Sequence, residues 1–307
     1  MSSSPLILID GSNFTFWRYN ATKAWWSHAK QGEPEDCSVE NSLFRNKYTK
    51  HFWDTITKIE KKFKTDNLIW CQDTPRRKLW RMDIDTDYKG TRDDQKCPEI
   101  GPIFEYTYGT LLEEKKCLAI SAENAEADDC VGVICNYVRE NQPDREIVII
   151  SNDTDFLQLV DNKVQLVKPA KLKPVPLKSE SGEKYLKTKI LTGDTSDNIP
   201  KVFKGCGPKK AEELINDPRA FELQVKSQPD RWARYQHNLN LISFQQIPEE
   251  IQKDILTKYE KLITSSPPPE KIQLKKNKPN SKPKIMSKRK KPKILKKKPT
   301  LSLSIKH

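Results

Sequence analysis

Three short apolar runs, each followed by carboxylates, organise the first half of the chain. They cover residues 6–9, 68–71 and 147–150, and none of them alternates with polar residues. Uninterrupted apolar runs of this length are typical of strands that are buried on both faces of a parallel sheet. Residues 48–63 and 126–139 have the periodicity of helices that lie between such strands. The pattern predicts an α/β domain whose ligand crevice lies beyond the carboxyl ends of its strands.

The rest of the chain departs from this pattern in three places. Residues 75–116 mix basic and aromatic side chains over far more residues than a usual connection, so we interpret them as a functional insertion in a domain of residues 1–170. Residues 171–262 are expected to form a helical region. Residues 263–307 are rich in Lys and Pro and carry too few large apolar residues to fold, which predicts a disordered basic tail.

Positive charge is concentrated in this tail. Residues 266–307 contain fifteen Lys and Arg residues and one acidic residue, which gives them a net charge of +14. The whole chain has a net charge of +13, so residues 1–265 carry about −1. A flexible polycation neutralises nucleic-acid phosphates without reading their sequence. The alternatives are a solubilising tail, a localisation signal, and a docking peptide at 301–305, which lacks an aromatic anchor.

Composition excludes several classes of protein. The longest aliphatic runs have four residues, whereas a membrane-spanning helix needs about 20. The first residues lack the basic and apolar segments of a secretory signal. Seven cysteines are scattered without a Cys-x-x-Cys pair and do not cluster with the four histidines, which disfavours a zinc site and predicts reduced thiols. We expect a monomeric protein that does not bind membranes and lies in the cytoplasm. For a viral protein this would be the cytoplasm of the infected host.

Nine carboxylates lie in five short motifs, at the ends of the predicted strands or at helix ends. They are Asp10, Asp73, Glu126, Asp128, Asp129, Asp153, Asp155, Asp194 and Asp197. If they converge they require cations, because two like charges about 4 Å apart repel by about 4 kcal/mol at an effective dielectric constant near 20. Oxygen ligands favour Mg²⁺, with Mn²⁺ as a substitute, and two such ions about 3.5–4 Å apart suit phosphodiester hydrolysis. A helix cap is the alternative for any one motif, but caps do not explain all five together.

The order and spacing of the motifs resemble those of the 5′-nuclease (flap-endonuclease) superfamily. The matching segments are Leu-Ile-Asp10-Gly-Ser-Asn, Tyr88-Lys89-Gly-Thr-Arg92, Glu126-Ala-Asp128-Asp129, Ser151-Asn-Asp153-Thr-Asp155 and Gly193-Asp194-Thr-Ser-Asp197. Within the superfamily the chain is most similar to the phage RNase H branch, over roughly residues 5–262. The resemblance implies a PIN-like fold with a central, mostly parallel sheet, a helical arch insertion, and a C-terminal helical DNA-binding region of helix-hairpin-helix type.

The resemblance also implies roles for the acidic residues. The first of two metal ions would be held by Asp10, Asp73, Glu126, Asp128 and Asp153. The second ion would be held, largely through water, by Asp155, Asp194 and Asp197, with Asp129 supporting the cluster.

The same resemblance implies roles for several basic residues. Lys89 and Arg92, one helical turn apart, would form the pair of the arch that grips the scissile phosphate; a solvated pair of loop charges is the alternative. Residues of the arch that would contact DNA are Arg76, Arg77, Lys78 and Tyr88. The hairpin residues that would meet duplex phosphates, with K⁺ as a further expected ion, are Gly205, Gly207, Lys209 and Lys210. The alternative for either glycine is a helix stop, and Lys201 departs from the Gly found in many members of the family.

The expected function is a Mg²⁺-dependent, structure-selective 5′→3′ exonuclease and flap endonuclease of a phage or virus. It would remove RNA primers and 5′ flaps during DNA replication or repair. Its expected partners are DNA and RNA–DNA hybrids with 5′ flaps or nicks, and a sliding clamp or single-strand-binding protein. A PIN-type ribonuclease that cuts single-stranded RNA and a catalytically silent DNA-binding accessory protein are the alternatives.

Overall fold

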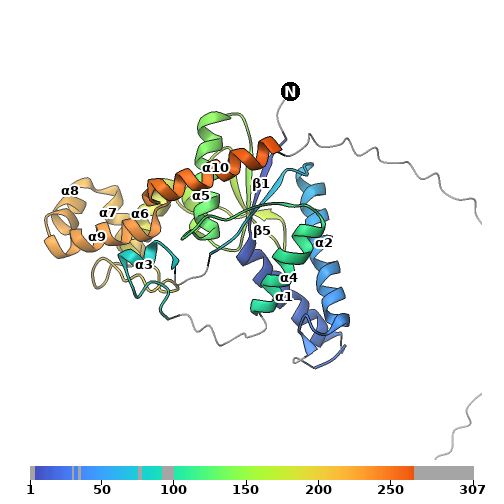
Figure 1. Cartoon of the computed structure of the whole chain (residues 1–307). Helices are drawn as coiled ribbons and strands as arrows, with labels where there is room; N and C mark the ends of the chain where they lie inside the picture. The colour runs from blue at the N-terminus through green and yellow to red at the C-terminus, as the bar shows by residue number, and fades with distance from the viewer. Residues whose placement is uncertain (1–3, 30, 34–35, 75–77, 92–99, 266–307) are drawn as a thin grey trace, which may run out of the picture. The chain divides into compact units, whose positions relative to one another are not determined.

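The structure is a computed structural model that describes residues 4–29, 31–33, 36–74, 78–91 and 100–265 (Figure 1). The chain divides into two units, residues 1–266 and residues 267–307. The second unit lies outside the described residues, and so does the predicted basic tail from residue 266 onward.

A six-stranded sheet forms the centre of the first unit, in the order β3-β2-β1-β4-β5-β6. The strands are β1 (Leu6–Asp10), β2 (Leu68–Cys71), β3 (Leu118–Ile120), β4 (Ile147–Ile150), β5 (Val164–Lys168) and β6 (Lys173–Pro174). All pair in parallel except β6, which runs antiparallel to β5. Every residue of β1, β2 and β4 is buried, which confirms the three strands predicted from the apolar runs.

Helices cover both faces of this sheet (Figure 1). Alternate residues of β1 point to opposite faces, because side chains along a strand alternate. Leu6 and Leu8 pack with α5 (Ala127–Asn141) and α10 (Glu249–Ser265). Ile7 and Ile9 pack with helices on the other face. Those helices are α1 (Gly11–His28), α2 (Ser42–Phe63) and α4 (Ile100–Tyr106).

The remaining elements are short or belong to a helical region. Near the sheet these are α3 (Arg81–Ile84), the π-helix η4 (Thr107–Leu112) and the 3₁₀ helix η5 (Asp155–Leu159). The helical region contains α6 (Gly182–Thr192), α7 (Pro208–Asn216), α8 (Pro218–Phe221), η6 (Glu222–Lys226), α9 (Pro229–Ile242) and η7 (Phe244–Gln246). It has an apolar core of its own, in which Ile190, Leu191 and Leu214 are buried. None of the described helices is long and apolar enough to cross a membrane.

The last helix of the described chain extends past residue 262, where the helical region is predicted to end. The last helix, α10, ends at Ser265 and packs on the sheet domain through Ile251, Ile255 and Tyr259 rather than on the helical region. The spacing of these three residues identifies a helix face, but it does not specify which core the face joins.

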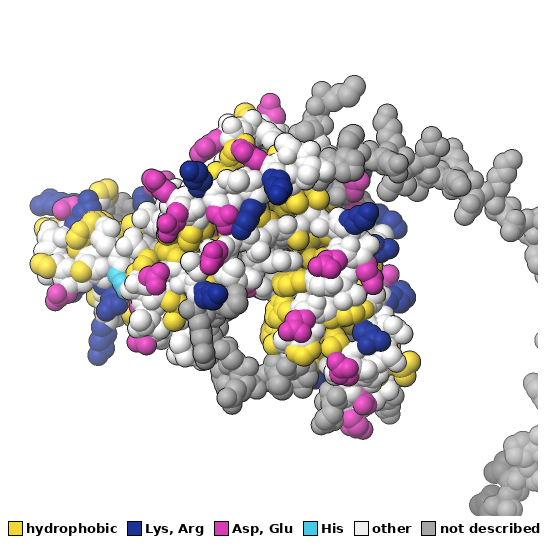
Figure 2. All heavy atoms as spheres, in the orientation of Figure 1, with side chains coloured by type: hydrophobic (Ala, Val, Ile, Leu, Met, Phe, Trp, Pro, Cys, Tyr) yellow, Lys and Arg dark blue, Asp and Glu magenta, His cyan; other side chains and the backbone are white. Residues whose placement is uncertain are grey.

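The predicted state of the cysteines agrees with the structure where it describes them. All six described cysteines are free thiols, five of them buried and Cys117 half-buried. Acidic and basic side chains are interspersed over the visible face of the described chain (Figure 2), as expected for a segment with almost no net charge.

Candidate metal centre

The carboxyl ends of β1, β2 and β4 bring the first acidic residues together. Asp10 ends β1 and caps α1, accepting a hydrogen bond from the Asn13 N–H at 3.1 Å. Its other oxygen accepts a hydrogen bond from the Ser151 hydroxyl, just after β4, at 2.7 Å. Asp73 follows β2 and accepts the N–H of Ala127, the first residue of α5. Three strand ends and the start of α5 therefore meet at one place, as the apolar runs predict.

The start of α5 adds three more carboxylates. Oxygens of Glu126, Asp128 and Asp129 lie within 4.8 Å of one another. Glu126 and Asp129 form a reciprocal capping box. The Glu126 side chain accepts the backbone N–H of Asp129, and the Asp129 side chain accepts the backbone N–H of Glu126. Oδ1 of Asp128 is buried and has no hydrogen-bond partner among the residues that the structure describes. A buried carboxylate oxygen without a partner is costly in a protein interior, and a cation would satisfy it.

Two pKa shifts record the crowding of negative charge. Burial and the nearby charge of Asp73 raise the pKa of Asp10 to about 7. Burial and the nearby charge of Glu126 raise the pKa of Asp128 well above its usual value. Both carboxyls are therefore easier to ionise when a positive charge is added.

Lys89 supplies one positive charge inside this group of acids. Its ammonium pairs with Oε1 of Glu126 and lies 3.9 Å from Oδ2 of Asp197, and its backbone N–H donates to the Asp197 carbonyl at 2.9 Å. Burial alone would raise the pKa of Glu126, but Lys89 and Arg81 outweigh it and lower that pKa.

The backbone at Lys89 is a turn and not the predicted helical turn. Its φ is 57°, and the turn is closed by the Gly90 N–H, which donates to the Asp87 carbonyl at 2.9 Å. Just before it, the Asp87 N–H donates to the Asp85 side chain at 2.9 Å. A side-chain acceptor of this kind competes with helix formation. The helical spacing expected between Lys89 and Arg92 therefore fails at Lys89, and Arg92 lies outside the described residues.

A second acidic group surrounds Lys189. Its ammonium lies 2.6 Å from Oδ1 of Asp155 and 2.5 Å from Oδ2 of Asp194. Burial and Asp153 raise the pKa of Asp155 to about 7, although Lys189 acts in the opposite direction. The Asp155 N–H donates to Asp153 at 2.9 Å, which links this group to the end of β4. Lys189 is absent from the residues predicted from sequence.

The turn after α6 positions Asp194 and Asp197. Gly193 ends α6 with φ 69°, and a Cβ there would lie 2.4 Å from the carbonyl oxygen of Ile199. Asp194 and Ile199 exchange backbone hydrogen bonds of 2.8 and 2.7 Å, which close the turn. This turn directs Asp197 toward Lys89, so it belongs with the first acidic group, while Asp194 belongs with the second.

Tyr88 does not have the exposed position expected of a DNA contact. Its side chain is only 3% exposed, and its ring packs in an apolar cluster with Leu79, Ile199 and Leu241. Its hydroxyl donates to Oε2 of Glu126 at 3.0 Å. In the structure the residue holds Glu126 instead. The sequence did not indicate this, because an aromatic ring beside basic residues is also typical of an exposed DNA contact.

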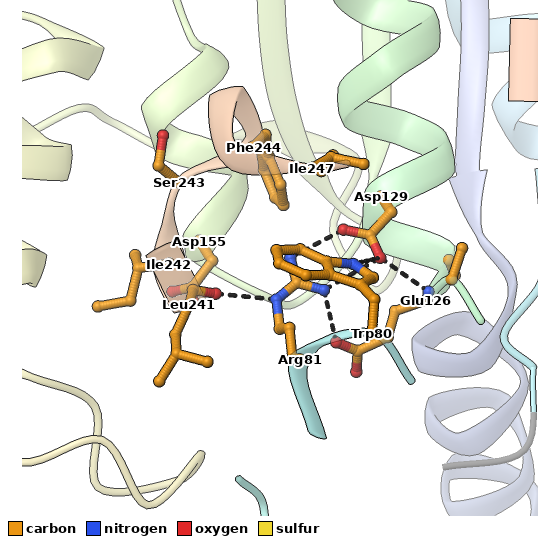
Figure 3. A network of polar contacts seen from close by, with 12 residues as sticks. Trp80, Arg81, Glu126, Asp129, Asp155, Leu241, Ile242, Ser243, Phe244 and Ile247 are labelled. Atoms are coloured by element: carbon orange, nitrogen blue, oxygen red, sulfur yellow. Dashed lines mark hydrogen bonds and ion pairs between the residues drawn. The ribbon is translucent and has the colours of Figure 1, made fainter. Parts of the chain in front are cut away.

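Two residues that were not predicted complete the centre (Figure 3). Arg81 is 2% exposed and forms ion pairs with Glu126 and Asp129, both at 2.8 Å. The indole N–H of Trp80 donates to Oδ2 of Asp129 at 3.0 Å. Both oxygens of Asp129 are thereby occupied. No local pattern identifies this arginine as buried, because its partners Glu126 and Asp129 lie 45 and 48 positions away in the sequence.

The other residues predicted to contact DNA differ in whether the structure describes them and in how exposed they are. Arg76 and Arg77 lie outside the described residues, and Lys78 is exposed. Gly205 has φ 88°, and Gly207 is the N-cap of α7. Lys209 is exposed, and Lys210 is half-buried, 3.4 Å from Glu213.

The donor set fits a divalent ion such as Mg²⁺. The groups that converge are carboxylates, which hard cations prefer, and one of them offers a buried oxygen without a partner. Arg81 and Lys89 neutralise only part of the first group. The arrangement can therefore bind a hard cation near strand ends, where parallel α/β proteins bind their ligands.

Comparisons with known proteins identify the family of this chain. Residues 5–191 match the family model described as 5′-3′ exonuclease, N-terminal resolvase-like domain. A 5′-3′ exonuclease of Bacillus subtilis (strain 168) is 28% identical over 237 residues, which cover 74% of this chain and 75% of the relative. Ribonuclease H of Enterobacteria phage T4 is 29% identical over 216 residues, which cover 62% of this chain and 69% of the relative.

Solved structures share the fold. The T5 5′-exonuclease with bound zinc has a TM-score of 0.63 and 18% identity, covering 85% of this chain and 98% of its own. A bacteriophage T5 flap endonuclease in a complex with DNA and metal ions has a TM-score of 0.60 and 18% identity, covering 83% and 99%. The family match extends over more than half of the chain and confirms the resemblance seen in the motifs. The chain belongs to the 5′-3′ exonuclease family.

Proposed function

We propose that this protein is a Mg²⁺-dependent, structure-selective 5′→3′ exonuclease and flap endonuclease that removes RNA primers and 5′ flaps during DNA replication or repair. The observation that carries the proposal is the cluster of Glu126, Asp128 and Asp129 at the start of α5, in which Oδ1 of Asp128 is buried without a partner among the described residues. The names of two relatives support it, a ribonuclease H and a flap endonuclease crystallised with DNA and metal ions.

The carboxylates divide into two groups of ligands. The residues proposed for the first ion are Asp10, Asp73, Glu126, Asp128 and Asp153, and those for the second are Asp155, Asp194 and Asp197. The assignment of Asp197 to the second ion rests on the family resemblance, because its carboxylate lies 3.9 Å from the Lys89 ammonium of the first group in the described structure. Asp129 is assigned to support on the same resemblance, and both of its oxygens already accept hydrogen bonds. Two divalent ions in such a site supply a water of lowered pKa and stabilise charge on the attacking and leaving oxygens.

Lys89 has two proposed roles. In the described structure its ammonium neutralises part of the charge on Glu126. Once another cation neutralises these acids, the ammonium is released to stabilise negative charge on the scissile phosphate as a point charge. Lys189 is the equivalent neutralising cation between Asp155 and Asp194.

The helical region is proposed to bind duplex phosphates. α7 begins at Pro208, with Gly207 as its N-cap and no side-chain cap, so the N–H groups of Lys209 and Lys210 in its first turn are the donors that an anion could meet. A Cβ at Gly207 would meet no atom within 4 Å, so packing does not require this glycine, whereas the φ of 88° at Gly205 itself favours glycine. Both observations favour close approach of a phosphate backbone, in a helix-hairpin-helix element with K⁺ as a further ion. Three further parts of the proposal rest on the family resemblance. They are the helical arch of residues 75–116, the role of its Arg92, and a sliding clamp or single-strand-binding protein as a partner of the tail.

Cleavage of defined substrates tests the proposed function. A 5′-labelled flap duplex, a nicked RNA–DNA hybrid and a single-stranded RNA are incubated with the protein in Mg²⁺ or in EDTA. Cutting at the junction or 5′ end, in Mg²⁺ only, is the expected result. Cutting of the single-stranded RNA alone would identify a PIN-type ribonuclease instead, and binding without cutting would identify an accessory protein.

A further inference from the structure

Arg81 occupies a buried position between the acidic start of α5 and the end of α9 (Figure 3). Its guanidinium donates four hydrogen bonds: one to Glu126, two to Asp129 and one to the carbonyl of Leu241. The indole ring of Trp80 covers it, with 4.5 Å between the guanidinium carbon and the ring centroid. One side chain thus joins three segments that are far apart in the sequence.

The contacts on the α5 side hold Glu126 in two ways. Arg81 binds Oε2 of Glu126 directly, at 2.8 Å. It also binds both oxygens of Asp129, at 2.8 and 3.0 Å, and Asp129 in turn accepts the backbone N–H of Glu126 at 2.9 Å. Both the carboxylate and the backbone of Glu126 therefore depend on the guanidinium.

The contact on the α9 side satisfies a carbonyl that the helix leaves unpaired. Leu241 lies in the last turn of α9, where carbonyls have no partner within the helix and a cation is favourable. Nε of Arg81 donates to this carbonyl at 2.8 Å. The side chains of Leu241, Ile242 and Leu79 are buried in one apolar cluster beside it, which keeps water from the contact. A second link between the same segments is the 2.9 Å contact of His237 with Asp85.

We propose that Arg81 is a positioning residue that fixes the orientation of Glu126 in the metal centre and fastens the centre to the C-terminal end of α9. The proposal rests on the proposed role of Glu126 as a metal ligand. A lysine could not replace it, because an ammonium is a compact point charge, whereas the planar guanidinium binds Asp129 through two nitrogens and still reaches Leu241.

The test compares Arg81→Lys with a matched variant, Arg139→Lys. Arg139 lies in the last turn of the same helix, α5, and pairs with Asp161 away from the centre. The affinity for Mn²⁺ alone is measured by calorimetry on the full chain. Loss of a group that orients a metal ligand costs about 10–100-fold in affinity. That loss is expected for Arg81→Lys, while Arg139→Lys stays within about two-fold of the unsubstituted protein.

Hydrogen exchange in EDTA tests the link to α9 separately. Amides in the last turn of α9 are expected to exchange faster in Arg81→Lys, even without metal. Unchanged Mn²⁺ affinity would overturn the role in positioning Glu126, and unchanged exchange would overturn the link to α9. If Arg81→Lys does not fold, Trp80→Phe removes the indole donor to Asp129 and keeps a smaller aromatic ring beside the guanidinium. A several-fold loss of Mn²⁺ affinity is then expected, and unchanged affinity would overturn the proposal.

A cleavage measurement distinguishes this proposal from the proposed function. The flap-cutting rate of Arg81→Lys is expected to be low at limiting Mn²⁺ and to recover at saturating Mn²⁺, because the defect lies in metal affinity. A defect that saturating Mn²⁺ leaves unchanged would overturn the proposal. If the unsubstituted protein cuts no substrate, the proposed function fails, whereas the Mn²⁺ titration still decides the role of Arg81.

Discussion

At the scale of single residues, the candidate metal centre holds more carboxylates than cations among the residues that the structure describes. Arg81 and Lys89 are the described cations that pair with Glu126, and neither pairs with Asp10 or Asp128. Asp10 instead accepts hydrogen bonds from neutral donors, and its pKa is raised to about 7 by burial and Asp73. The charge on Asp10 therefore opposes folding unless a cation is bound.

The pH dependence of stability follows from this shift in pKa. Burial and Asp73 raise the pKa of Asp10 from 3.8, its value in an unfolded chain, to about 7 in the folded protein, so its ionisation destabilises the metal-free protein as pH rises from about 4 to about 7. Asp10→Asn removes that charge. In EDTA the variant is expected to gain stability over the unsubstituted protein between pH 5 and pH 8, by on the order of 2 kcal/mol. Urea unfolding at both pH values measures the gain, and a difference that does not change with pH would contradict the shift.

The ammonium of Lys89 is expected to act on the reaction more than on binding. Lys89→Ala should lower the rate of flap cleavage by about 100-fold, as for loss of one donor to a developing oxyanion, and change DNA affinity by less than about three-fold. Single-turnover rates and binding titrations measure the two effects. Lys187→Ala is the control, because Lys187 is exposed and pairs only with Glu183. An effect on affinity alone would reduce Lys89 to a contact that positions the DNA.

At the scale of secondary-structure elements, the sequence was informative where a segment is buried on both sides. The strands β1, β2 and β4 could be predicted because their apolar runs have no polar interruption. β5 contains Gln165 and Lys168, and β3 has only three residues, so neither differs from a loop in its pattern. Their place in the sheet depends on pairing with distant strands, which no local pattern encodes.

The candidate site was predictable to a similar extent. Its acidic residues could be found because each follows a strand or flanks a helix. The cations could not, since Lys189 meets Asp155 across 34 positions and Arg81 meets Asp129 across 48. Such pairs exist only once the chain is folded, and the same holds for the burial of Tyr88.

The turn after α6 requires glycine at position 193. Gly193→Ala places a side chain at φ 69° and 2.4 Å from a backbone carbonyl oxygen. The expected loss of stability is about 1–3 kcal/mol, with a lower cleavage rate because Asp194 and Asp197 move. Gly101→Ala is the matched control, since a Cβ at Gly101 meets no atom within 4 Å. Denaturant unfolding compares the two variants, and equal stabilities would show that the turn tolerates a side chain.

At the scale of the whole molecule, charge is divided between two parts of the chain. Residues 1–265 carry about −1 and the acidic centre, whereas residues 266–307 carry +14. Non-specific attraction to nucleic acid is therefore expected from the tail, and chemistry from the first unit.

Removal of residues 266–307 tests this division. The shortened chain is expected to bind DNA at least 10-fold more weakly at about 50 mM salt, with a smaller dependence on salt, because fewer counterions are released. Its cleavage rate at saturating DNA should stay within about two-fold. Binding titrations from low to high salt measure the change, and an unchanged salt dependence would show that the tail does not contact DNA.

The most direct test of the proposed metal chemistry is the Mg²⁺-dependent cleavage rate of Asp153→Asn on a 5′-labelled flap duplex. The substitution removes one carboxylate charge beside β4 and keeps the shape of the side chain. The control is Asp144→Asn, which makes the same change at an exposed position. The expected result is a rate lower by about 1,000-fold or more, equivalent to about 4 kcal/mol in the barrier, with DNA affinity within a few-fold of the unsubstituted protein. Cleavage at the normal rate by Asp153→Asn would contradict the assignment of these carboxylates to catalytic metal ions.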